Sequence, residues 1–320
     1  MHPDRNSKNI PYPAQFAILI GLAGAGMILG TILSLVVWLV MTGRSFADLP
    51  AHMLDPGNYN VIMVMQVVST FFMFLVPPVM LAVIAYRYPR RFLGMHSAIN
   101  FRQVVLVLAI LLLTFPLSGA LGEINQILPI PHAWTVKFKA MEQARSQQEA
   151  ALIHISTFSR YLISMVIIGL LPGFFEELAF RAGLQNVLTR WFNGPVVAIL
   201  LTSILFSAAH FSYYGFLVRM ALGVILGLIY YFSGNLWLGV LFHFLYNGLQ
   251  VTALYLSTGS GPGNSKDIEK NFPWWTGVVA LVLIWILFDY FRKISREQLK
   301  RLPELPEPKD DFLNWVSRKS

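Results

Sequence analysis

The most constraining feature of this chain is its series of apolar runs, several of which reach about 20 residues. A run of that length is typical of a transmembrane helix, because about 30 Å of hydrocarbon must be crossed at 1.5 Å per residue. Lipid offers no hydrogen-bond partner to a bare backbone, so the spans should be helical. Only 12% of the residues are charged. The sequence therefore predicts an all-α, polytopic membrane protein with about eight transmembrane helices.

The predicted spans divide the chain into four segments. Residues 1–122 hold three spans, and Pro77-Pro78 is expected to kink the second. A polar stretch over 123–159 predicts an interfacial helix at Met141–Ile155. Residues 160–256 hold four spans, and 257–320 hold the last span and a charged tail. The spans are expected at 16–41, 60–86, 104–122, from 161 past 181, from 195 past 210, 216–232, 236–256 and 274–291.

Basic residues lie in the loops and tails that flank the apolar runs, so the net charge of +8 indicates membrane topology and no nucleic-acid partner. An inside amino terminus places Arg87, Arg90, Arg91 and Arg102 in one cytoplasmic loop. We therefore expect both termini to be cytoplasmic, in a plasma membrane if the source is bacterial. Membrane lipids are the expected surroundings. The chain contains no cysteine, which excludes disulfides and thiolate metal sites.

Ionisable side chains inside a span are functional candidates, because each costs roughly 2.5–3.5 kcal/mol to insert. In the fourth span Glu177 and Arg181 are i,i+4 neighbours and are expected to pair. Glu176 lies about 100° round the helix from Glu177 and lacks that partner. It is therefore a candidate proton acceptor. Adjacent glutamates also occur where a helix ends in water, so this pair alone does not establish a site.

Two other spans carry polar groups at one-turn spacing. His210 follows Phe206 by four residues, and Asn247 follows His243 by four, so each pair shares a helix face. Singly, such a histidine is usually a packing residue, and such an asparagine often bridges helices. Together with the two glutamates, these groups could activate a water and stabilise an oxyanion. The set Glu176, His210 and His243 could instead bind a divalent metal such as zinc. No other cofactor is indicated.

The heights of these residues in the membrane constrain the helix lengths. Glu176 and His243 lie near the predicted cytoplasmic ends of their spans, whereas His210 lies about 15 residues, or roughly 22 Å, into its own. The three can meet only if the fourth helix extends beyond Arg181, or if the fifth starts among the headgroups and tilts. We favour a long fourth helix that reaches about Leu188.

Three short motifs, each on its own predicted span, resemble those of the CPBP family of intramembrane proteases. This family includes the type II CAAX prenyl endopeptidases and the bacterial Abi or bacteriocin-processing proteins. The resemblance covers about residues 161–256 and implies an eight-helix fold with a conical membrane cavity and peptide-bond hydrolysis. In chain order, the motifs are Glu176-Glu177-x-x-x-Arg181, Phe206-x-x-x-His210 and His243-x-x-x-Asn247.

The resemblance also implies a role for each motif residue. Glu176 would be the general base with His210 beside it, and His243 and Asn247 would stabilise the oxyanion. Glu177 would complete the catalytic set. The supporting residues would be Arg181 and Phe206. Whether hydrolysis is of the glutamate type or requires a metal stays open, although the chain has no His-Glu-x-x-His pair, the zinc motif of many metalloproteases.

Two other classes of function compete with an intramembrane endopeptidase. The first is a non-catalytic transporter or scaffold that reuses the fold. A transporter should show broken helices at corresponding positions of its two halves. The two candidate breaks, Pro77-Pro78 and Pro172-Gly173, do not look like corresponding positions. The second is a lipid-modifying membrane hydrolase that uses the same Glu and His groups. The sequence leaves the substrate open between a free peptide and a lipidated or membrane-bound protein.

Overall fold

The computed structural model describes residues 6–53, 55–152, 157–257 and 272–303. These residues form helices and turns, and no strand occurs among them, which confirms the predicted all-α class. Six helical rods in the described ranges are long and apolar enough to cross a membrane. They are Tyr12–Thr42, Tyr59–Ala85, Phe101–Ile127, Phe158–Trp191, Phe216–Ser233 and Trp274–Leu299.

Two further helices occupy the positions of the remaining predicted spans. Helix α11 (Pro195–Ala208) is apolar but has only 14 residues. Helix α13 (Leu236–Ser257) has 22 residues, but polar side chains that include His243 and Asn247 lower its mean hydropathy. The chain is therefore an integral membrane protein by its apolar helices, and the count of eight spans stays a prediction.

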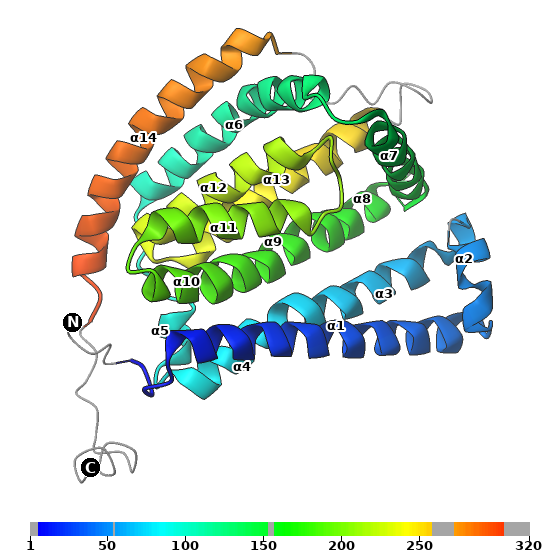
Figure 1. The fold of residues 1–320 in the computed structure, drawn as a ribbon, viewed down its shortest axis with the longest axis horizontal. Helices are drawn as coiled ribbons and strands as arrows, with labels where there is room; N and C mark the ends of the chain where they lie inside the picture. The colour runs from blue at the N-terminus through cyan, green and yellow to red at the C-terminus, as the bar shows by residue number, and fades with distance from the viewer. Residues whose placement is uncertain (1–5, 54, 153–156, 258–271, 304–320) are drawn as a thin grey trace.

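The helices lie roughly side by side in layers (Figure 1). Helix α1 (Tyr12–Thr42) packs against α3 (Tyr59–Thr70) and α4 (Val76–Ala85) on one side of the molecule. On the other side, α6 (Phe101–Ile127) packs against α14 (Trp274–Lys300). Between these layers lie α8 to α13, including α12 (Phe216–Ser233). The central layer carries all the predicted site residues.

The start of α1 and the last turns of α14 lie at one end of the molecule, together with α5 (Pro89–Phe92) (Figure 1). We call this the terminal end. The short helix α2 (Leu49–His52) and the longer α7 (His132–Leu152) lie at the opposite end, which we call the far end.

The fourth predicted span is one continuous rod from Phe158 to Trp191. It contains α8 (Phe158–Ser164), α9 (Leu171–Glu176) and α10 (Asn186–Trp191), joined by wider π-helical turns at Met165–Leu170 and Glu177–Gln185. The expectation of a long fourth helix is therefore confirmed. π-helical turns are frequent at functional sites, and the second of these begins at a predicted site residue.

The rod and α11 form an antiparallel hairpin with arms of equal length. Fifteen residues separate Glu176 from Trp191 at the end of α10, and fifteen separate Pro195 at the start of α11 from His210. Both stretches are helical over most of their length, so the two side chains lie at comparable distances from the connecting turn. This symmetry explains how a glutamate and a histidine on different helices reach the same height.

Two expectations about the first half of the chain need correction or refinement. The interfacial helix starts at His132, nine residues before the predicted Met141, and its predicted last residues, 153–155, lie outside the described residues. The disturbance at Pro77-Pro78 is a π-helical turn just before them, at Phe71–Leu75. A proline removes one backbone donor and clashes with the preceding turn, so a widened turn at this place is its expected effect.

Candidate active site

Glu177 and Arg181 form a buried ion pair at the centre of the molecule. The Arg181 Nη1 and Glu177 Oε1 atoms are 3.2 Å apart, and each side chain is only 1% exposed. Arg181 Nη2 also donates to the Gly223 carbonyl at 3.4 Å, and the guanidinium lies 4.6 Å from the centroid of the Phe206 ring. The pairing matches the i,i+4 spacing in the sequence. Glu177 therefore has a neighbouring cation on its own helix as its charge partner.

His243, on α13, joins this pair through its Nδ1 atom. Nδ1 lies 3.0 Å from Glu177 Oε1. A carboxylate oxygen accepts hydrogen bonds, so Nδ1 carries the proton and donates it. This bond leaves Nε2 free to face the other glutamate, and Nε2 lies 3.8 Å from Glu176 Oε2. A carboxylate that orients a histidine in this way defines which ring nitrogen can act.

Glu176 is the partly exposed member of the cluster. Its side chain is 15% exposed, against 1% for Glu177. Its Oε2 atom is nevertheless buried and makes no hydrogen bond within the described part of the chain. A buried acceptor without a partner requires an explanation, and a reactive role is one of the recognised explanations. The other glutamate also has such an atom, Glu177 Oε2.

His210 lies just past the end of α11. Its Nδ1 atom donates to the Phe206 carbonyl at 2.8 Å, because a carbonyl oxygen can only accept. Nε2 is therefore the basic nitrogen of the ring. His210 interacts electrostatically with both Glu176 and His243. The structure thus places Glu176, His210 and His243 within electrostatic reach of one another.

The Phe206 ring lies among the charged groups and packs against three of them. Its centroid is 5.0 Å from that of His210 and 5.9 Å from that of His243, both in edge-to-face geometry. Its face receives the Arg181 guanidinium. Phe206, which was predicted to be a supporting residue, thus packs against both imidazoles and the arginine. Its 3% exposure excludes bulk water from the ion pair behind it.

Asn247 lies one turn beyond His243 but has a different hydrogen-bond partner. Its Nδ2 atom donates to the Ile168 carbonyl at 3.5 Å, the upper limit of a hydrogen bond. Ile168 belongs to the π-helical turn Met165–Leu170, where the carbonyls do not follow the regular helical pattern. Asn247 therefore bridges α13 to the rod, and its predicted contact with a reaction intermediate stays a prediction.

A metal site finds no support in the geometry. No group of three or more His, Cys, Asp or Glu side chains in the described ranges is arranged to hold a metal ion. The predicted ligand set of Glu176, His210 and His243 does not form such a group, so the geometry of the described residues does not support a metal-dependent protease.

The sequence analysis missed two residues that bear on the site. Arg219 lies in the apolar run of α12 and acts electrostatically on His210. An arginine inside an apolar run was a visible signal. Gly239 lies one turn before His243, and a Cβ atom there would approach Glu177 Oε2 to 2.9 Å. The absence of a side chain at Gly239 therefore leaves room for the Glu177 carboxylate. No sequence signal distinguishes Gly239 from other glycines at which helices pack.

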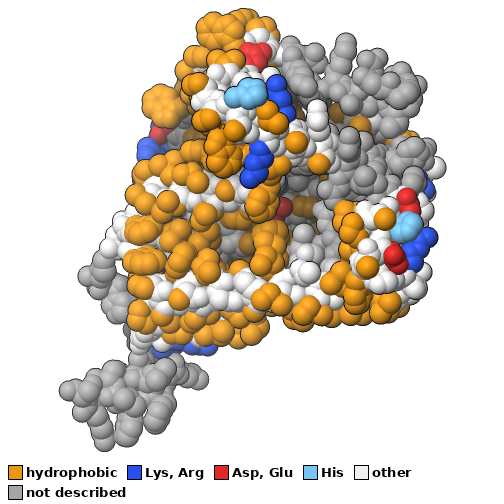
Figure 2. Space-filling view, turned by 45° about the vertical axis from the view of Figure 1, so that its right-hand side comes forward, with side chains coloured by type: hydrophobic (Ala, Val, Ile, Leu, Met, Phe, Trp, Pro, Cys, Tyr) orange, Lys and Arg blue, Asp and Glu red, His pale blue; other side chains and the backbone are white. Residues whose placement is uncertain are grey.

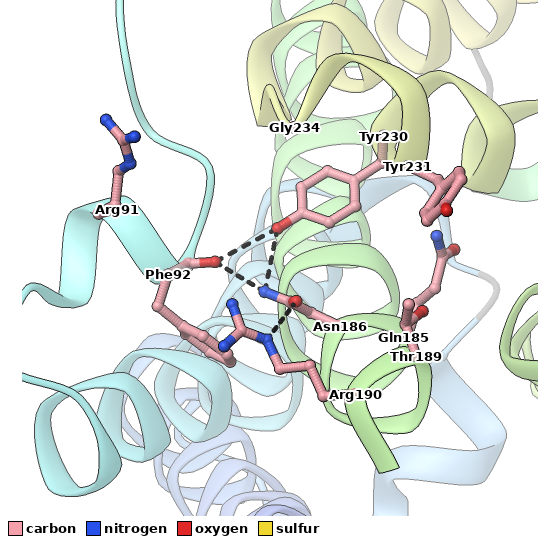
Figure 3. A pocket seen from close by; sticks show the side chains of 9 residues that line it. All are labelled: Arg91, Phe92, Gln185, Asn186, Thr189, Arg190, Tyr230, Tyr231 and Gly234. Atoms are coloured by element: carbon pink, nitrogen blue, oxygen red, sulfur yellow. Dashed lines mark hydrogen bonds between the residues drawn. The ribbon is translucent and has the colours of Figure 1, made fainter. Parts of the chain in front are cut away.

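A separate pocket of about 260 Å³ lies at the terminal end of the central layer (Figure 3). None of the predicted site residues lines it. Its polar groups bond to one another: Asn186 Nδ2 donates to the Phe92 carbonyl at 2.8 Å and lies 3.4 Å from the Tyr230 hydroxyl. Arg190 Nε donates to Asn186 Oδ1 at 3.1 Å. This network joins the rod to α5 and α12 below the buried ion pair.

The fold and the cluster together define a class of protein. It is an integral membrane protein of apolar helices, with paired carboxylates, two imidazoles and an arginine gathered between its central helices. Residues 158–249 match the family model of type II CAAX prenyl endopeptidase Rce1-like proteins. This segment carries all three motifs, and the match supports the resemblance to the CPBP family of intramembrane proteases. At the level of the family, this match supports an intramembrane endopeptidase of the CAAX type.

The family match covers less than a third of the chain, from the start of α8 to within α13. No curated protein and no solved structure matches the chain significantly. The substrate and the chemical mechanism are therefore argued from the site itself.

Proposed function

We propose that this protein hydrolyses a peptide bond within the membrane with a water that Glu176 and His210 activate. The substrate would be a peptide or a lipidated membrane protein, as the family acts on peptides or prenylated proteins. One observation carries the proposal: Glu176 Oε2 is buried without a hydrogen bond among the described residues, and it lies 3.8 Å from His243 Nε2. The catalytic core would be residues 160–256.

In the proposed reaction, Glu176 accepts a proton from water as the water oxygen attacks the carbonyl carbon of the scissile peptide bond. The electron pair of the C=O bond moves to its oxygen and forms an oxyanion. When the C–N bond breaks, the amine leaves with the proton that Glu176 returns. His210 interacts electrostatically with Glu176, and its basic Nε2 would share the proton with Glu176.

The Glu177–His243 pair supports a different step. Because Glu177 accepts from Nδ1 of His243, the ring presents Nε2 to the reaction. Doubly protonated, the ring would donate a hydrogen bond from Nε2 to the oxyanion, and Asn247 would be a second donor if it leaves Ile168. Arg181 fixes the charge and position of Glu177 and acts only through it.

The test is the substitution Glu176→Gln, which keeps the size of the side chain but removes the proton acceptor. A general base supplies about 10²–10⁴ in rate, so cleavage should fall by that factor. The purified protein in proteoliposomes would be assayed with internally quenched peptides, one set with a farnesylated cysteine and one without. Glu123→Gln, an exposed glutamate on α6, is the matched control and should cleave like the wild type. Full activity in folded Glu176→Gln would reject the assignment.

A further inference from the structure

The pocket of Figure 3 has positive charge in its walls and no carboxylate. Two of the nine residues that line it are arginines, Arg91 of α5 and Arg190 of α10, and none of the nine is an aspartate or a glutamate. Its other polar side chains are amides and hydroxyls, among them Thr189 and Tyr231. Guanidinium, amide and hydroxyl groups all donate hydrogen bonds. The composition of the walls therefore favours an anion as the ligand.

Arg190 is held in place at one wall of the pocket. Its Nε atom donates to Asn186 Oδ1 at 3.1 Å. Its guanidinium lies 5.3 Å from the centroid of the Tyr86 ring and 5.6 Å from that of the Phe92 ring, and both contacts are of the cation–π type. A cation that is fixed in this way needs no reordering when an anion enters, so little binding energy is lost in arranging it.

Arg91 is the second cation of the pocket, and it is held less tightly. In Figure 3 its side chain stands apart from the hydrogen-bonded network that joins Asn186, Arg190 and the Phe92 carbonyl. Arg91 is partly exposed, whereas the neighbouring Phe92 is buried. The planar guanidinium of arginine matches the geometry of a phosphate group and can bind it through two parallel hydrogen bonds. Arg91 is therefore suited to contact the anion directly, while Arg190 contributes a fixed charge.

The pocket lies where two membrane helices end. The rod ends at Trp191 and α12 ends at Ser233, and the last turns of both line the pocket. Trp191, Phe192 and Tyr231 are exposed nearby, and exposed tryptophan and tyrosine are typical of the boundary between lipid tails and headgroups. Figure 2 shows one face of the molecule that is covered largely by hydrophobic side chains, as expected where helices face lipid tails. The pocket is therefore at the level of the lipid headgroups.

We propose that this pocket binds a phosphate-bearing anion, and that the source of the phosphate is the headgroup of an anionic phospholipid. Its volume of about 260 Å³ is below the roughly 300–1,000 Å³ of pockets that enclose drug-sized ligands, so it admits a headgroup and leaves the acyl chains outside, along the helices. The arginine-rich loop around α5 predicts that this end is cytoplasmic, and basic pockets between helices on that side are typical sites for anionic headgroups.

An anion in the pocket would contact α5 through Arg91 and the rod through Arg190. It would thus strengthen the connection that the bond from Asn186 Nδ2 to the Phe92 carbonyl makes between these two elements. A ligand that binds only the folded protein raises its melting temperature. Binding can therefore be measured as stabilisation, and the result does not depend on the proposed proteolytic function.

The test is thermal unfolding of delipidated protein in a neutral detergent, titrated separately with phosphatidylglycerol, phosphatidylcholine and inorganic phosphate. Arg91→Gln removes one cation from the pocket, and Arg91→Lys keeps the charge but loses the planar donors. Arg102→Gln is the matched control, because it removes an equal charge from an exposed position at the start of α6, outside the pocket.

We expect phosphatidylglycerol to raise the melting temperature of the wild type and of Arg102→Gln alike, and phosphatidylcholine to have a much smaller effect. In Arg91→Gln the lipid concentration at half of the maximal shift should rise about fivefold, the factor that one arginine contributes near an anionic membrane surface. Arg91→Lys should lie between the wild type and Arg91→Gln, and it carries the test if Arg91→Gln does not fold.

The arms also distinguish the sources of the phosphate. A shift with inorganic phosphate and none with phosphatidylglycerol would overturn the lipid as the source and keep the phosphate site. The absence of a shift with either anion would overturn the site itself. An equal loss of affinity in Arg91→Gln and Arg102→Gln would also overturn it, since the lipid would then be attracted by the net positive charge alone.

Discussion

The buried pair of Glu177 and Arg181 gives the sharpest prediction about how the site is held together. Arg181→Met removes the cation and keeps an apolar side chain of comparable length. The Glu177 carboxylate would then stay buried with only the His243 Nδ1–H as a charge-stabilising partner. Removal of one member of a buried ion pair typically costs about 3–5 kcal/mol, because the other charge is left uncompensated.

We expect the loss of stability in Arg181→Met to lie in the upper part of that range. The residue is 0% exposed, so solvent cannot replace the lost charge, and its face contact with Phe206 is lost as well. In a chain of this size 1 kcal/mol corresponds to roughly 2–4 °C in melting temperature, so Arg181→Met should melt on the order of 10 °C below the wild type. Glu177→Gln in the same background removes the uncompensated charge. The double variant should therefore be more stable than Arg181→Met alone.

The assay is thermal unfolding in detergent micelles, followed by the fluorescence of the eight tryptophans. Arg102→Met is the matched control, because Arg102 is exposed at the start of α6, and it should change stability by no more than about 0.5 kcal/mol. The reasoning fails if Arg181→Met melts with the wild type. It also fails if the double variant is no more stable than Arg181→Met, since the loss would then come from packing and not from the charge.

Three further predictions concern the surroundings of the pair and the chemistry. Gly239→Ala should reduce cleavage while the protein stays folded, because the added Cβ meets Glu177 Oε2; Gly122→Ala, which has room, should not, and equal activities would show that the carboxylate can move freely. His96 lies outside the spans, and burial lowers its pKa below 6.5. The unfolded chain therefore binds the proton more readily, and stability present above pH 6.5 is lost as the pH falls through the folded pKa. Melting curves should show that acid lowers the stability of His96→Gln less than that of the wild type. Identical pH profiles for the two proteins would contradict the prediction. Cleavage should survive a strong chelator, and a loss that zinc restores would favour a metal-bound hydroxide.

The sequence predicts well what depends on local spacing. The Glu177–Arg181 pair follows from i,i+4 geometry, and it is present at 3.2 Å. The long fourth helix follows from the need to bring Glu176 to the height of His210, and the rod indeed continues to Trp191. Apolar runs likewise predict the membrane helices, because length and hydropathy are properties of the sequence alone.

What the sequence does not predict depends on contacts between helices or on weak patterns. The bond from His243 Nδ1 to Glu177 requires the rotation and approach of α13 against the rod, which helix periodicity does not specify. The early start of α7 was missed although Trp134, Phe138 and Met141 lie at i, i+4 and i+7, a short helical stripe within a mostly polar stretch. The π-helical turn at Glu177–Gln185 has no composition signal beyond ordinary helix-forming residues.

The short length of helix α11 explains why the loop that follows it needs polar partners. Helix α11 has 14 residues and rises only about 21 Å, less than the thickness of the hydrocarbon core. Its connecting loop would expose polar backbone to lipid if nothing covered it. Asn125 bonds the loop at the Tyr213 carbonyl and the Leu217 amide, and Glu142 bonds Ser212. The loop of a hairpin that stops short of the membrane surface therefore has its polar groups satisfied by partners on α6 and α7.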